Sequence, residues 1–217
     1  MKLINLIEAV SDFFESDAAG DLKGVYHPEI IKVHLADVFN AIVYQTWKNG
    51  KAFSDFSQLD AWSRVYEVTL TSQTGTIGYA LLPFPPMQLP DNMGIRQVCD
   101  HDDNANVFAY MEATANVVFA ELDVNTMDNT PIFSLEQNDA GVGAGDESHL
   151  LRLRKLPVAP DAITSLDVMM IVPLDQLDDY DDVIMPAGTE DSFVRQVIDL
   201  MSKKPSPDIA TDQVISK

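Results

Sequence analysis

The chain has 217 residues, of which 46% are hydrophobic and 22% are charged, as in folded proteins with one core and not as in disordered ones. It carries 14 Lys and Arg against 34 Asp and Glu, and the formal net charge of −20 argues against a protein that wraps nucleic acid or binds acidic membranes. Cys99 is the only cysteine, which excludes an intramolecular disulfide.

The first fifty residues predict two amphipathic helices. The first carries an apolar face about four turns long, made of Leu3, Ile4, Leu6, Ile7, Val10, Phe13 and Phe14. Asn5, Glu8 and Asp12 interrupt the run of apolar residues along the sequence too early for a secretory signal peptide, so we expect a cytoplasmic location. The second helix starts at Pro28, ends at the stop signal Lys48-Asn49-Gly50, and carries Ile30, Ile31, Leu35, Val38, Phe39, Ile42 and Val43. Residues 1–50 are therefore predicted to form a helical hairpin.

Residues 51–182 predict a β-rich domain that ends in an acidic linker, Pro173–Asp182. After one helical turn at Ser57–Trp62, β-branched and aromatic residues alternate between polar turns. A proline-rich stretch, residues 83–94, is expected to be a stiff surface loop. Eight strands are predicted, at Arg64–Thr71, Thr76–Leu82, Ile95–Cys99, Val107–Glu112, Asn116–Val124, Ile132–Glu136, Leu150–Leu156 and Leu166–Val172. Strands at this spacing indicate an antiparallel sandwich or a barrel-like sheet.

Residues 183–217 predict a short C-terminal helix followed by an extended interaction tail, which completes an α+β fold. Thr189 is a suitable N-cap, and Pro205 and Pro207 end the helix. One apolar stripe contains Phe193, Val194, Val197, Ile198 and Met201. A helix this short is marginal alone, so its stripe has to dock on the rest of the chain or on a neighbouring subunit. We treat the stripe and the two prolines as candidate interface residues.

Asp100, His101, Asp102 and Asp103 form the densest group of candidate metal ligands. Carboxylate oxygens suit calcium or magnesium, and the imidazole could add a nitrogen ligand for zinc. Their spacing matches no known metal-binding loop, so a solvated turn between strands is the simpler interpretation. No metal and no other cofactor is expected.

Two charged segments are further candidates for an interface. Asp178, Asp179 and Tyr180 belong to the acidic linker, which is either a solvated run or a contact for a basic partner. Arg152 and Arg154 project from one face of a predicted strand. They form either an ordinary sheet surface or the surface on which the acidic linker of an identical neighbour docks.

The segment VIMPAGTEDSFVRQVIDLM, with the tail SKKPSPDIATDQVISK after it, ends a chain ordered as helical hairpin, β-domain and closing helix. In these features the chain resembles the virion neck or ring proteins of crAss-like tailed bacteriophages. The resemblance implies a non-enzymatic structural subunit of the head–tail connector. Such proteins form closed rings, commonly twelvefold, below the portal and around the DNA channel.

On this resemblance, the expected partners are further copies of the chain, the portal protein and other neck or tail ring proteins. DNA would pass nearby without specific binding, because an acidic channel wall repels phosphates. No membrane partner is expected. The expected location is the virion neck or tail, assembled in the cytoplasm of the bacterial host.

Two other function classes remain open from the sequence. One is a small binding or hydrolytic β-domain that depends on a divalent cation held by residues 100–103 or by the acidic linker. The other is an acidic accessory protein that binds a basic partner by charge alone. A tightly bound stoichiometric ion would favour the first class, and dissociation from the partner at high salt without ring formation would favour the second.

Overall fold

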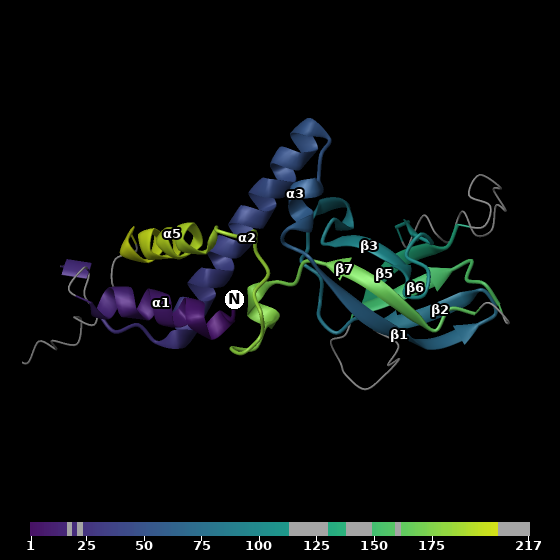
Figure 1. Ribbon diagram of the computed structural model, residues 1–217, viewed down its shortest axis with the longest axis horizontal. Coiled ribbons are helices and arrows are strands. Elements are labelled where there is room, and N and C mark those ends of the chain that lie inside the picture. The colour runs from purple at the N-terminus through teal and green to yellow at the C-terminus, as the bar shows by residue number, and fades with distance from the viewer. Residues whose placement is uncertain (17–18, 21–23, 113–129, 138–148, 159–161, 204–217) are drawn as a thin grey trace, which may run out of the picture.

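The computed structural model describes residues 1–16, 19–20, 24–112, 130–137, 149–158 and 162–203. Its elements gather into two groups that lie next to each other (Figure 1). One group consists of helices from both ends of the chain, and the other is a single sheet of seven strands. The fold is α+β, as the sequence predicts.

Three long helices form the first group: α1 (Leu3–Glu15), α2 (Pro28–Phe53) and α5 (Glu190–Lys203). The two N-terminal helices contact each other, and α5 packs against both. Pro28 opens α2 as predicted, because its N–H is not needed there, and His27 Nδ1 accepts a hydrogen bond from the backbone N–H of Glu29 at 3.3 Å. The C-terminal helix therefore completes a cluster begun by the N-terminal pair.

The predicted stop of α2 at Gly50 is wrong. The helix continues to Phe53 and ends at Ser54, whose φ of 53° is left-handed. Gly50 lies inside the helix because the chain folds back onto it, and a Cβ at this position would be 2.7 Å from the carbonyl oxygen of Asp55. The one-turn helix expected next is α3 (Ser57–Asp60).

The sheet contains β1 (Arg64–Thr74), β2 (Ile77–Leu81), β3 (Ile95–Asp100), β4 (Ala109–Tyr110), β5 (Ile132–Gln137), β6 (His149–Arg154) and β7 (Ser165–Met170). Their order is β3-β7-β1-β2-β6-β5-β4, and every pair is antiparallel except β4 with β5. An isolated bridge between Cys99 and Val107 brings the residues before β4 back to β3. The sheet is thereby nearly closed into a barrel, which decides between the two predicted architectures.

Two strand predictions differ from this arrangement. The strand predicted at Val107–Glu112 is reduced to the two residues of β4, because residues 106–108 are used for the bridge to β3. The strand predicted at Asn116–Val124 lies outside the described residues.

The proline-rich stretch is not the surface loop that the sequence predicts. Pro86, Met87 and Leu89 are buried, and the backbone N–H of Met87 donates to the carbonyl of Ile171 at 2.8 Å. The backbone also approaches itself closely, since a Cβ on Gly94 would lie 1.9 Å from the carbonyl oxygen of Met87. Prolines leave few N–H groups to satisfy, so this segment can line the core and end in a 3-10 turn, η2 (Pro90–Asn92).

One hydrophobic core joins the helices to the barrel. At the junction the rings of Phe39 on α2 and Trp62 before β1 meet edge to face, with centroids 5.5 Å apart. Leu174 and Leu177, in and after the 3-10 turn η4 (Leu174–Gln176), are buried beside them. Among the described helices, none combines the length and the apolar character needed to cross a bilayer.

Candidate interaction site

The apolar stripe of α5 docks on its own chain. Phe193, Val197 and Met201 are 1%, 0% and 2% exposed, and the helix contacts α1 and α2. Val194 and Ile198 flank the stripe and are half-buried. Of the two docking partners that the sequence allows, the structure has the rest of the chain, so the three buried side chains offer no surface to another subunit. Pro205 and Pro207 lie outside the described residues.

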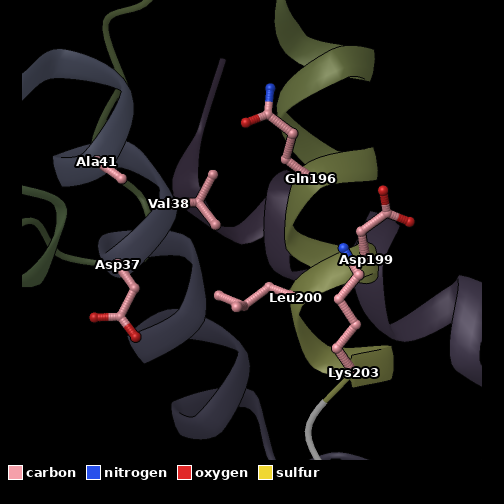
Figure 2. Close-up of a pocket in the computed structure, with 7 residues that line it drawn as sticks. All are labelled: Asp37, Val38, Ala41, Gln196, Asp199, Leu200 and Lys203. Atoms are coloured by element: carbon pink, nitrogen blue, oxygen red, sulfur yellow. The ribbon is translucent and has the colours of Figure 1, made fainter. Parts of the chain in front are cut away.

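A groove runs between α2 and α5 on the outside of the helical cluster (Figure 2). Val38 and Ala41 line it from α2, and Leu200 points across it from α5. Its rim carries charged and polar side chains, namely Asp37, Gln196, Asp199 and Lys203. The volume of about 510 Å³ is within the range of roughly 300–1,000 Å³ common for binding sites. An apolar floor with a charged rim suits a peptide segment.

The groove continues into an exposed apolar face of α2. Ile30, Val33 and Tyr44 are 44%, 58% and 49% exposed, and Ala41 is exposed between them. With Asp37 these residues are three or four positions apart, so they follow one side of the helix. The helix is thus apolar both toward the core and toward solvent. The sequence groups Ile30 with the other apolar positions of this helix, but in the structure it lies on the exposed side, apart from the buried Ile31 and Leu35.

A second hollow of about 570 Å³ lies between α2, the proline-rich stretch and the sheet. Its lining is mainly apolar and includes Tyr44, Met87, Leu89, Ile95 and Leu135. His149 also borders it, and its Nδ1 is buried without a hydrogen-bond partner among the described residues. Among the described residues that line this hollow, no carboxylate could work with this histidine as an acid–base pair.

The acidic linker is bound within its own chain, at the beginning of α1. The backbone N–H groups of Leu3 and Ile4 donate to the carbonyls of Asp181 and Asp179 at 3.0 and 2.8 Å. In the part of the chain that the structure describes, no side chain caps α1, and its first turn has no acidic residue, so these carbonyls satisfy two of its unpaired N–H groups. The linker also places negative charge at the positive end of the helix dipole.

Further contacts fix the linker to α2. Lys32 Nζ donates to the carbonyl of Leu177 at 2.8 Å and lies 3.4 Å from Asp179 Oδ1. Asp178 is exposed, and Tyr180 is 72% exposed, with Lys2 Nζ 5.8 Å from its ring centroid. Asp178 and Tyr180 therefore keep a surface for a partner, whereas Asp179 is partly engaged by Lys32.

The two arginines project from the barrel as the alternation predicts. Leu151 and Leu153 are fully buried, and Arg152 and Arg154 are half-buried on the opposite face of β6. Arg152 Nη1 contacts Glu136 Oε1 on β5 at 3.2 Å, and its guanidinium lies 5.8 Å from the ring centroid of Tyr79 on β2. Arg152 is thus part of the surface of its own sheet, and docking of a neighbour's acidic linker here stays a prediction.

The candidate metal ligands lie at the end of β3 and in the turn that follows it. Asp100 Oδ1 and Asp103 Oδ1 each accept a backbone N–H from two residues further on, both at 3.1 Å. His101 Nδ1 lies 2.8 Å from Asp167 Oδ1, and the hydrogen bond to this carboxylate, with the charge of Glu67, raises the pKa of the imidazole. Within the described part of the chain, no group of three or more His, Cys, Asp or Glu side chains is arranged to hold a metal ion.

The features that sequence reasoning missed are the groove and the exposed face of α2. One signal was available: between Ile30 and Tyr44 the apolar positions of α2 outnumber those that a single buried stripe needs. The position of α5 beside this helix could not be predicted from the sequence, because it depends on tertiary packing. The groove and the exposed apolar face of α2 are suited to binding a protein surface or a peptide segment.

No protein-family model matches the chain, and no curated protein has a significantly similar sequence.

Proposed function

We propose that this chain is a structural subunit of a tailed-phage virion that assembles into a ring of the head–tail connector, below the portal and around the DNA channel. The observation that carries the proposal is the exposed apolar face of α2 together with the groove beside α5. Exposed apolar side chains beside a groove with a polar rim are typical of protein–protein contacts.

Two properties of the sequence support the same function. The net charge of −20 would let duplex DNA pass without sticking, since acidic side chains repel phosphates. The resemblance of residues 183–217 to virion neck or ring proteins is the reason for proposing a head–tail connector as the assembly. The virion neck is accordingly the proposed location.

The test is the mass of the purified full-length chain in solution at moderate salt, measured by light scattering, alone and mixed with its candidate portal protein. A closed oligomer, or a stoichiometric complex with the portal, supports the proposal. A strict monomer that ignores the portal refutes it. Adding a chelator and then raising the salt concentration separates the connector from the two other function classes.

A matched pair of variants tests whether the exposed apolar face of α2 is part of the assembly interface. Val33→Glu adds a charge to the exposed apolar face, where Val33 is 58% exposed, so the fold is preserved. Ser72→Glu adds the same charge at an exposed position of β1 in the sheet. We expect V33E to weaken assembly and S72E to leave it unchanged. Equal assembly of both variants would remove the α2 face from the interface.

A further inference from the structure

The groove between α2 and α5 ends where the described chain ends. Lys203 is the last residue of α5 and also lines the groove. Residues 204–217 follow it directly in the sequence. This segment therefore starts at the rim of the groove. In an assembly of identical chains, one copy of the segment is available for every groove.

The composition of the segment is complementary to that of the groove. Its apolar side chains, Ile209, Val214 and Ile215, suit the apolar floor of the groove. It also carries both signs of charge at different positions, with Asp208 and Asp212 before Lys217. The rim carries Asp37, Asp199 and Lys203, so both signs of charge on the segment meet an opposite charge. A segment too polar to fold alone is ordered by such a surface.

We infer that the C-terminal segment of one copy binds in the α2/α5 groove of a neighbouring copy, an inference that rests on the proposed ring assembly. Because Lys203 ends α5 at the end of the groove, binding of the segment to its own groove would require the chain to turn back soon after Lys203. Proline fixes its own φ and restricts the residue before it to extended conformations, so alternate prolines at 205 and 207 oppose that reversal. The same stiffness lowers the entropy lost when the segment binds a neighbour.

Disulfide trapping in the full-length chain tests the inference. Ala41 lines the groove and is exposed, so A41C places a thiol on its floor, and V214C places one in the segment. The two single variants are mixed in equal amounts and treated with diamide. Cys99 is buried and remains in every chain as a common background. The control replaces A41C with S72C, an exposed position on β1.

We expect a covalent dimer of A41C with V214C, formed in about tenfold higher yield than the dimer of S72C with V214C, because a docked segment concentrates the two thiols. The double variant A41C/V214C should give a ladder of covalent multimers on a non-reducing gel. As a second measurement, A41E should reduce the oligomer mass found by light scattering, while S72E should not.

Two results overturn the inference and leave the proposed function standing. One is a protein that forms the oligomer but gives no more covalent dimer of A41C with V214C than of S72C with V214C. The other is an A41C/V214C double variant whose disulfide forms only within a single chain. A strict monomer with and without the portal protein, and without intermolecular cross-links, overturns both the inference and the proposed function.

Discussion

The docking of α5 on its own chain makes a quantitative prediction for Val197, which is fully buried. Val197→Ala removes two carbon atoms from the core, at about 0.8 kcal/mol for each buried methylene. The cavity left behind raises the loss of unfolding free energy to about 2–3 kcal/mol. For a chain of this length, that corresponds to a fall in Tm of about 5–10 °C.

The matched control is Val194→Ala, the same change one turn earlier on the half-buried flank of the helix. Because Val194 already contacts water, we expect it to cost less than about 1 kcal/mol. Urea unfolding followed by circular dichroism gives both free energies by linear extrapolation. Equal small losses for the two variants would show that the stripe is not buried in its own chain and would refute this account of α5.

Three further predictions concern other parts of the molecule. Gly94→Ala should cost about 3 kcal/mol or more in urea unfolding, since its Cβ would collide with the carbonyl of Met87, and a normal Tm would contradict the close approach. His101→Gln should lower Tm most at acid pH and progressively less as pH rises: the hydrogen bond to the carboxylate of Asp167 raises the folded-state pKa, so its stabilisation is complete below the ordinary value of 6.5 and is lost as pH rises through the raised pKa. A larger effect in alkaline buffer would contradict that sign. Deleting residues 206–217 should leave the circular dichroism spectrum and Tm unchanged and reduce the oligomer mass, and normal assembly would exclude the tail as an interface.

Local patterns were sufficient for the elements whose causes are local. The apolar spacing of α1, α2 and α5, the proline at the start of α2 and the alternation in β6 all act within a few residues of the position they determine. Gly50 shows where such reasoning fails. It has the composition of a helix stop, but its role is set by residues 55 and 56, which fold back over it.

The candidate site could be predicted only in part, because its surfaces depend on which helix lies beside which. The sequence identifies the stripe of α5 and the charged segments but not their partners. The acidic linker could be read as a solvated run because its carboxylates dominate the composition. In the structure, backbone carbonyls of Asp179 and Asp181 make its main contacts with α1, and composition does not report those groups. The exposed position of Ile30 could not be predicted for a similar reason, since one helix can be apolar on two sides.

The contact of the acidic linker with α1 and α2 has a consequence for the order of folding. Lys32 and Leu177 are hydrogen-bonded across 145 residues of sequence, and α1 has only 13 residues, too few for stability alone. During synthesis α1 is therefore made long before the carbonyls of Asp179 and Asp181 that cap its N-terminus. Closing so long a loop is slow and costly in entropy. We therefore expect α1 and residues 177–183 to open and close as one cooperative unit, with amide protons that exchange together.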